Sequence, residues 1–209
     1  DDYYISEGEI GPLSLTGFDS LYGFTSVPDN KILMKPRTDI GTDNNRKAYV
    51  DLGLTSGTLW ATMNVGATSE TDYGSYFQWG DTEDKRNAEC SWSSYKYNDS
   101  SELSKYNTGL NNNSGGVIDN KLTLDLEDDA ARANMGGDWR MPTSALMEEL
   151  AEETTSEWTT INDVNGRKFT SKKDTSKYIF IPASGERDGD NVWDVNLSCH
   201  LWSSSLSSS

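Results

Sequence analysis

The feature that most constrains the fold lies between residues 143 and 181, where a helical pattern is followed directly by three strand-like runs. The first part predicts a helix over residues 144–153, with Thr143 as its cap, because a threonine hydroxyl can accept from an amide of the first turn. Apolar side chains at helical spacing are expected to face inward, at Leu146, Met147 and Leu150. The acidic side chains are expected to form a solvated outer face, at Glu148, Glu149, Glu152 and Glu153.

The second part predicts a three-stranded antiparallel meander. Its strands are expected at residues 158–161, 167–171 and 178–181, which are rich in β-branched and aromatic residues. Asn165-Gly166 separates the first two runs, and Asn-Gly between such runs is the strongest local signal of a hairpin turn. A helix packed beside this meander indicates an α+β domain.

The rest of the chain supplies further short elements. Residues 49–52 and 58–63 are expected as strands on either side of a turn at 55–57. A second short helix is expected to start at Asp125 and to end at Gly136. Residues 81–121 are rich in Asp, Asn, Ser, Lys and Tyr and are expected to be mostly loop. The predicted architecture is therefore two short helices with a small, mostly antiparallel sheet and long loops.

The residue pattern changes near residue 48, from turn-rich sequence to strand-like runs. Residues 1–48 alternate short apolar pieces with turn residues and show no sustained helical period. We expect them to form an amino-terminal arm or the remnant of a preceding module. Residues 49–209 are expected to form the main domain.

Charge and rare residues exclude several classes of function. The chain has 34 Asp and Glu against 18 Lys and Arg, a net charge of -16, which repels nucleic acid and anionic membrane surfaces. It has no apolar run near the ~20 residues that span a bilayer, so no membrane insertion is expected. Two cysteines, expected to remain thiols, and one histidine are too few for a Cys/His zinc site. This composition disfavours most enzymes.

Several motifs occur in an order that resembles a known family. They are Tyr49-Val-Asp-Leu-Gly-Leu54, Ser56-Gly-Thr-Leu-Trp-Ala61, Asn64-Val-Gly-Ala67, Tyr73-Gly74, Phe77-Gln-Trp-Gly80, Asp128-Asp-Ala-Ala131, Gly136-Gly-Asp-Trp-Arg-Met-Pro-Thr143, Ile181-Pro-Ala-Ser-Gly185 and Trp202-Ser-Ser-Ser205. The chain from Tyr49 onward resembles the C-type-lectin-like surface proteins of Bacteroidetes, and among them the variable proteins diversified by diversity-generating retroelements. The resemblance implies a C-type-lectin-like fold, which formylglycine-generating enzymes share.

The resemblance also implies a function and a site. It implies a non-catalytic module, an adhesin or receptor-binding protein, whose variable carboxy-terminal loop contacts a protein or a glycan. The ligand-binding positions it implies are Glu186, Asp188, Asp190, Asn191, Trp193, Asp194, Asn196, Ser198, Cys199 and His200. The scaffold positions it implies are Arg187, Gly189, Val192, Val195 and Trp202. Independently of the family, this mixture of residue types has neither the alternation of a strand nor the spacing of a helix, and it favours contact chemistry over packing.

The family pattern also sets expectations about the ends of the domain and about cofactors. The closing strands that follow Trp-Ser-Ser-Ser in the family do not follow it here, so we expect the domain to lack them. Formylglycine-generating enzymes use a cysteine pair, but neither Cys90 nor Cys199 lies in a similar motif. The loop tripeptide of calcium-dependent sugar sites is not found either. We therefore expect no enzyme activity and no cofactor, although the many carboxylates are chemically suited to calcium.

Three interpretations of the function are compatible with the sequence, and they differ in partner and in location. The acidic charge favours a basic partner surface, and the resemblance places the protein at the cell surface or outside the cell. The alternative is a structural component of a pilus, a fibre or a phage tail, in which residues 1–48 dock into a neighbour. A formylglycine-generating-enzyme-like or calcium-dependent sugar-binding protein is the least favoured reading.

Overall fold

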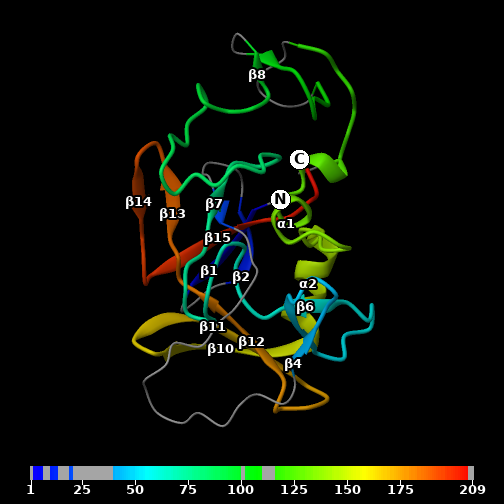
Figure 1. Ribbon diagram of the computed structural model, residues 1–209, viewed down its shortest axis with the longest axis vertical. Coiled ribbons are helices and arrows are strands. Elements are labelled where there is room, and N and C mark those ends of the chain that lie inside the picture. Colours follow the sequence, from blue (N-terminus) through cyan, green and yellow to red (C-terminus); the bar gives the residue numbers. More distant parts are fainter. Residues whose placement is uncertain are drawn as a thin grey trace.

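The computed structural model describes residues 2–6, 10–13, 19–20, 40–99, 102–109 and 116–206 (Figure 1). They form a mixed α+β structure with small, mainly antiparallel sheets and short helices, as the sequence predicts. The helices are η1 (Leu126–Asp128), α1 (Ala130–Met135) and α2 (Ser144–Glu153). No helix in the described ranges has both the length and the apolar character needed to cross a membrane.

The largest sheet has the strand order β2-β1-β15-β3-β7. Its strands are β2 (Ile10–Leu13), β1 (Asp2–Ser6), β15 (Ser198–Trp202), β3 (Asp19–Ser20) and β7 (Tyr76–Phe77). β15 runs antiparallel to β1 and parallel to β3, so it lies inside the sheet. All five residues of β15 are buried. Segments from the two ends of the described chain therefore meet in one sheet.

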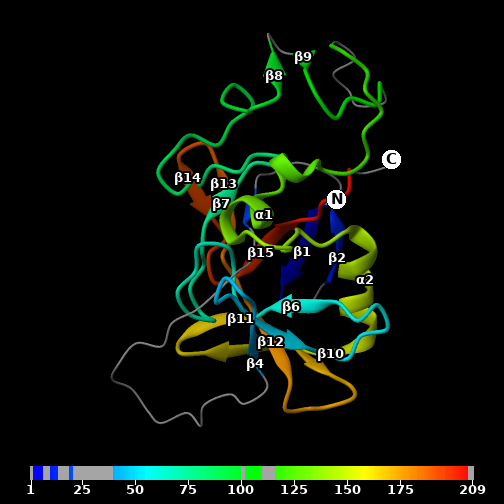
Figure 2. The same cartoon turned by 45° about the vertical axis from the view of Figure 1, so that its right-hand side comes forward.

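The smaller sheets surround this one (Figure 2). One contains β4 (Ile40–Thr42), β5 (Ala48–Asp51) and β6 (Leu59–Ala61), and another contains β10 (Thr154–Ile161), β11 (Val164–Ser171) and β12 (Tyr178–Pro182). Two short pairs are β8 (Asn98–Asp99) with β9 (Glu102–Leu103), and β13 (Glu186–Asp188) with β14 (Asn191–Trp193).

Strands from before and after residue 48, where a domain boundary was expected, pair with one another. β4 pairs antiparallel with β5, and Thr42 lies opposite Ala48. β1 and β3, both from the segment expected as an arm, flank β15. Residues on the two sides of the division therefore share sheets.

The α2 helix confirms the predicted bounds and cap but corrects the view of its acidic face. The Thr143 side chain accepts from the Leu146 amide, and Met147 and Leu150 are buried. Glu148 and Glu152 are exposed, as expected. The other two acids of the helix hold the turn between β5 and β6: Glu149 accepts from the Ser56 amide at 2.7 Å, and Glu153 accepts from the Thr55 amide at 2.8 Å. These two acids bind a neighbouring turn.

The meander is confirmed, but its turn was misplaced. β10 and β11 join through Asn162 and Asp163, whose φ angles are 48° and 65°. Gly166, expected in the turn, lies inside β11 opposite Pro182. A Cβ at Gly166 would meet the Ile181 carbonyl oxygen at 2.2 Å, so this position needs glycine for close packing of the strands.

The α1 helix starts later than predicted. Residues 126–128 form a separate 3-10 turn, and Asp129 caps α1 by accepting from the Arg132 amide at 2.9 Å. The helix ends at Gly136, which has a φ of 74°, as predicted. The start was placed too early because Asp125 and Asp129 are both suited to a cap, and only packing selects between them.

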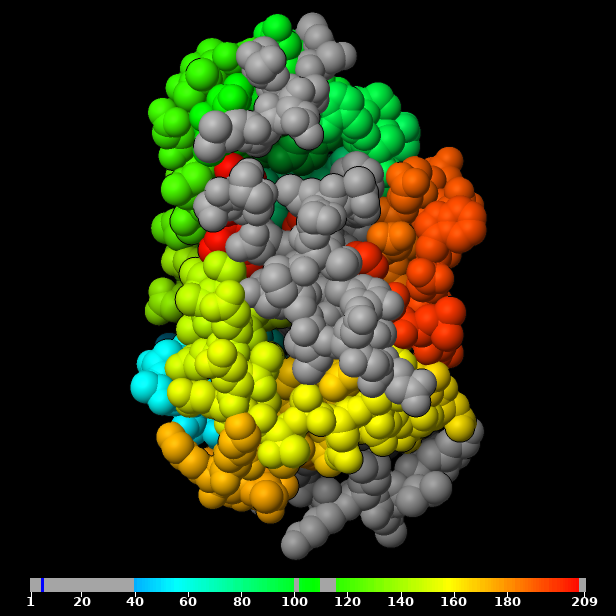
Figure 3. All heavy atoms as spheres, turned by 180° about the vertical axis from the view of Figure 1, so that it is seen from behind, coloured from blue at the N-terminus to red at the C-terminus, as the bar shows by residue number. Residues whose placement is uncertain are grey.

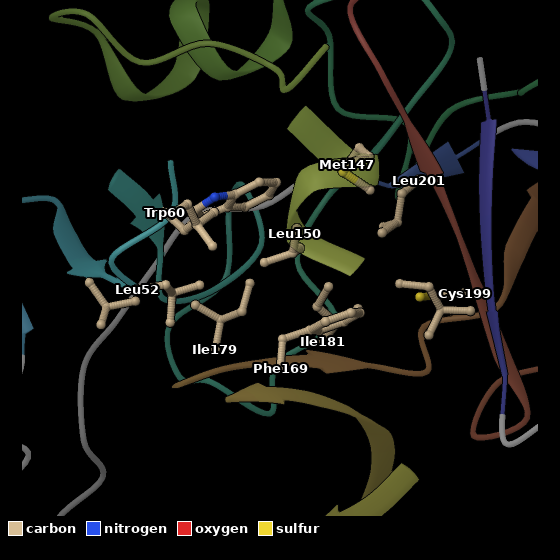
Figure 4. Packing of buried hydrophobic residues seen from close by; sticks show 12 residues of the cluster. Leu52, Trp60, Met147, Leu150, Phe169, Ile179, Ile181, Cys199 and Leu201 are labelled. Atoms are coloured by element: carbon tan, nitrogen blue, oxygen red, sulfur yellow. The ribbon is translucent and has the colours of Figure 1, made fainter. Parts of the chain in front are cut away.

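Two clusters of buried side chains form most of the core. One surrounds α2 and contains residues from β5, β6, β11, β12 and β15, among them Leu52, Trp60, Phe169, Ile181 and Leu201 (Figure 4). The other is rich in aromatic rings and includes Trp79, Tyr106 and Trp202. Trp202, expected as a scaffold position, is 5% exposed, and its indole donates to the Phe77 carbonyl at 3.1 Å, so it lies in the core.

Candidate functional site

The ten predicted ligand-binding positions lie on the β13–β14 hairpin, the turn that follows it, and the first half of β15. Glu186 pairs with Trp193, Arg187 with Val192, and Asp188 with Asn191. Figure 3 shows this hairpin as orange to red-orange spheres at one edge of the molecule. We call residues 186–197 the hairpin segment.

The structure divides the predicted positions into an outer and an inner group. The exposed positions are Asp188, Asp190, Asn191, Trp193 and Asp194, and the partly buried ones are Glu186 and Asn196. The buried positions are Ser198, Cys199 and His200. The outer group covers the hairpin segment, whereas the inner group lies in β15.

The inner group is corrected from ligand contact to interior. Cys199 is 1% exposed and packs in the core cluster around α2. Ser198 is 1% exposed as well. His200 is 8% exposed, and its Nδ1 lies 3.6 Å from a carboxylate oxygen of Glu186. All five residues of β15 are buried, so the side chains of the inner group lie in the interior and not at the surface.

Asn196 has a structural role at the turn after β14. Its backbone has a φ of 66°, a left-handed conformation that asparagine tolerates better than most residues. Its side-chain oxygen accepts from the Tyr73 hydroxyl at 3.1 Å and from the Asn165 amide at 3.2 Å. Asn196 thus joins the turn to β11 through its side-chain oxygen.

Four large apolar side chains of the hairpin segment are exposed to solvent. Trp193 is 54% exposed and Leu197 65% exposed, while Val192 and Val195 are 37% and 39% exposed. Val192 and Val195 were expected as scaffold, and their exposure corrects that expectation. The signal available in the sequence was the run Val-Trp-Asp-Val-Asn-Leu at residues 192–197, in which four of six residues are apolar. Exposed apolar groups gathered on one short segment are typical of interaction sites.

The hairpin segment is braced by a second segment of the chain. Cys90 and Gly189 form an antiparallel bridge, with the two amide-to-carbonyl distances at 3.1 and 2.7 Å. The Arg187 guanidinium is buried and donates to the Ala88 carbonyl at 3.0 Å. At the base of the hairpin, a Cβ on Gly185 would meet the Trp193 carbonyl oxygen at 1.9 Å, so glycine permits the close approach. The backbone that carries the exposed side chains is therefore held by the bridge at Gly189 and by the hydrogen bond of Arg187.

A tyrosine also supports the base of the hairpin from inside. The Tyr76 hydroxyl donates to the Ser184 carbonyl at 2.6 Å. Burial raises the pKa of Tyr76 to about 12, because the phenolate form would lose its hydration. The hydroxyl therefore stays protonated and remains a donor across the ordinary pH range.

Three acidic side chains at η1 lie close enough together to resemble a cation site. Asp125, Glu127 and Asp128 bring carboxylate oxygens within 4.8 Å of one another. The Lys105 ammonium lies among them, 2.6 Å from Asp125 and 2.5 Å from Asp128. Lys96 also pairs with Asp128 at 2.7 Å. Burial alone would raise the pKa of Asp128, but the hydrogen bonds from these lysines hold it well below its usual range. The lysines supply the positive charge that this group needs.

The neighbouring carboxylate Asp129 points elsewhere and has a different environment. It accepts from the amides of Arg132 and Met141, at 2.9 and 3.0 Å. Burial raises the pKa of Asp129 despite these hydrogen bonds. The two adjacent acids thus make separate structural contacts, since Asp128 belongs to an ion-pair cluster and Asp129 caps a helix.

A cavity of about 160 Å³ lies apart from the hairpin segment. It is bordered by β6, β12, the segment before α2 and the helix itself, and its walls include Trp60, Met141, Ile179 and Phe180. Apolar atoms dominate these walls, and the charged side chains that reach it are Asp138 and Arg140.

No family model, curated protein or solved structure matches this chain. The candidate site therefore rests on the geometry of the hairpin segment.

Proposed function

We propose that this protein is a non-catalytic ligand-binding module of the C-type-lectin-like kind, an adhesin or receptor-binding domain. The hairpin segment is its contact surface, and the ligand is a protein or a glycan. The motifs from Tyr49 to Ser205 support this fold, and with it a location at the cell surface or outside the cell. A phage tail is the alternative location.

One observation supports the proposal above all others. A rigid hairpin, fixed at Cys90–Gly189 and Arg187–Ala88, exposes four large apolar side chains among exposed carboxylates. Exposing such groups has no benefit for the stability of an isolated domain, whereas an apolar centre with a polar rim is the usual anatomy of a protein interface. The proposed contact set is Glu186, Asp188, Asp190, Asn191, Val192, Trp193, Asp194, Val195 and Leu197.

Trp193 is the expected centre of this surface. Tryptophan is enriched among the residues that contribute most to binding, since one rigid ring buries a large area. Truncating such a residue costs ~2 kcal/mol or more, which corresponds to roughly 30-fold in affinity. We expect Trp193→Ala to reduce ligand affinity by about this factor.

The test uses two probes, a printed array of glycans and a displayed library of random peptides. We expect the protein to select ligands from at least one of them, and we expect Trp193→Ala to lose them. Leu126→Ala is the matched control, because Leu126 is 52% exposed and lies on η1, outside the hairpin segment. Equal binding by Trp193→Ala and the native protein, or no selected ligand from either probe, would contradict the proposal.

A further inference from the structure

The segment around Cys90, which pairs with the hairpin at Gly189, also exposes an aromatic side chain. Cys90 forms the bridge with Gly189, and two residues later Trp92 is 38% exposed. The Trp92 ring stacks on Tyr95 with a centroid distance of 5.5 Å and an interplanar angle of 28°. Nothing in the sequence motifs assigned a role to Trp92.

Residues 88–92 are held firmly beside the hairpin. The buried side-chain amide of Gln78 donates to the Ser91 carbonyl at 2.7 Å, and Arg187 donates to Ala88. The bridge at Gly189 joins this segment to the tip of the hairpin, so the two backbones lie side by side at that point. We call residues 86–95 together with the hairpin segment the composite face.

The size of the composite face suits a protein partner. The hairpin segment alone has 12 residues, fewer than the roughly 20–30 residues that each side of a standard protein interface contributes. Residues 86–95 add ten more, and without the buried Cys90 and Arg187 the two segments together offer 20 residues, at the lower end of this range. A partner that used the whole face would therefore touch Trp92 as well as Trp193.

The charge of the hairpin segment indicates which kind of protein surface fits. Its carboxylates are Glu186, Asp188, Asp190 and Asp194, and its one basic residue, Arg187, is 6% exposed with its guanidinium turned toward Ala88. Within the described part of the chain, no ion pair joins Asp188, Asp190 or Asp194 to another residue. The exposed charge on the segment is thus negative and unneutralised.

We propose that the composite face, residues 86–95 and 186–197, binds a protein surface in which apolar side chains are surrounded by lysine or arginine. The inference rests on the proposed function and names its partner class. The aliphatic side chains of Val192, Val195 and Leu197 match an apolar protein surface better than a sugar. The carboxylates supply the complementary rim, and the net charge of -16 attracts a basic partner over a longer range.

The test is a selection from displayed random peptides of about 12 residues, which reach roughly 40 Å when extended and can span both segments. We expect the selected peptides to combine apolar residues with an excess of lysine or arginine, and to bind less well as salt rises. The triple variant Asp188→Asn, Asp190→Asn, Asp194→Asn is expected to bind them about tenfold more weakly, from exposed ion pairs of modest strength.

A matched triple variant separates local from general charge. Glu148→Gln, Glu152→Gln and Asp163→Asn remove the same number of charges at exposed positions on α2 and the β10–β11 turn. This control is expected to bind the peptides nearly as well as the native protein. An equal loss of binding in both triple variants would overturn the proposal, because it would show an effect of net charge alone.

Trp92 tests the extent of the face. Trp92→Ala is expected to weaken the selected peptides several-fold, and Trp92→Phe to recover most of that loss, with folding of both variants followed by circular dichroism. Unchanged binding by Trp92→Ala would overturn the composite face.

Selected peptides without basic residues, or no selected peptides at all, would overturn the partner class. Glycan binding that Trp193→Ala abolishes would also overturn it while leaving the proposed function intact.

Discussion

The Asp128 carboxylate offers a quantitative test of how the long loop is held to the domain. Its side chain is 2% exposed and accepts from Lys96 at 2.7 Å, from Lys105 at 2.5 Å and from the Tyr106 hydroxyl at 2.6 Å. These contacts join η1 to Lys96, Lys105 and Tyr106, which belong to the long loop-rich part of the chain. We expect Asp128→Asn to release this connection without creating a cavity.

The loss of stability in Asp128→Asn depends on how exposed its hydrogen-bond partners are. Removing one member of a buried ion pair typically costs ~3–5 kcal/mol. Lys96 and Lys105 retain 38% and 21% exposure of their side chains, so water replaces part of what they lose. Tyr106 is 2% exposed, and its hydroxyl would meet an amide that accepts less well than a carboxylate. We expect Asp128→Asn to lower the free energy of unfolding by about 2 kcal/mol at neutral pH.

The dependence on pH gives a second measurable consequence. The pKa of Asp128 is lowered in the folded protein, so its stabilising contribution is complete above the ordinary carboxyl pKa of ~4 and is lost as the pH falls below that value. The native protein should therefore lose stability on acidification faster than Asp128→Asn. Urea unfolding followed by tryptophan fluorescence at a series of pH values measures both effects.

Glu127→Gln is the control for this experiment. The Glu127 side chain is 74% exposed and lies 3.6 Å from the Lys105 ammonium. Its neutralisation should leave the free energy of unfolding almost unchanged. If Asp128→Asn costs no more than Glu127→Gln, or if both variants keep the native dependence on acid, the ion-pair cluster does not hold the loop.

Two further predictions concern the meander and the base of the hairpin. Gly166→Ala should destabilise the protein by ~1–3 kcal/mol, because its Cβ would meet the Ile181 carbonyl oxygen at 2.2 Å; an unchanged denaturation midpoint would show that the sheet relaxes at no cost. Tyr76 should ionise near pH 12, and since its pKa is raised by folding, its contribution to stability should be complete below pH ~10 and decline above it. The difference in phenolate absorbance between the native protein and Tyr76→Phe measures this ionisation, and a difference centred near pH 10 would contradict the burial of the hydroxyl.

The sequence predicted α2 and the meander because the signals for these elements lie within their own residues. The α2 helix has a cap at Thr143 and apolar residues at helical spacing, and both signals are independent of the rest of the fold. The meander of β10, β11 and β12 follows in the same way from its β-branched and aromatic runs. The position of the first turn did not follow, since Asn162-Asp163 and Asn165-Gly166 are both suited to a turn. Packing of Gly166 against the next strand decided between them.

The surface exposure of the proposed binding positions was predicted only in part, for a similar reason. Trp193 and the exposed carboxylates of the hairpin lie at the surface, where polar composition is informative. Ser198, Cys199 and His200 were misplaced because β15 is buried on both faces, and such a strand has no alternation of polar and apolar residues to mark it. The role of Cys90 and Trp92 beside the hairpin depends on a contact between residues about a hundred positions apart, for which one sequence contains no local signal.

The pairing of β1 with β15 sets the order in which the molecule can be assembled. Tyr4 lies opposite His200, so the central sheet requires two strands separated by almost the whole described chain. Loop closure over such a separation is slow, whereas α2, the meander and the β13–β14 hairpin form from neighbouring residues. During synthesis β1 can pair at once with β2, but the edge of β1 that faces β15 has no partner until residues 198–202 have been made. We expect the central sheet to form last, and the hairpin segment to gain its fixed orientation only at that step.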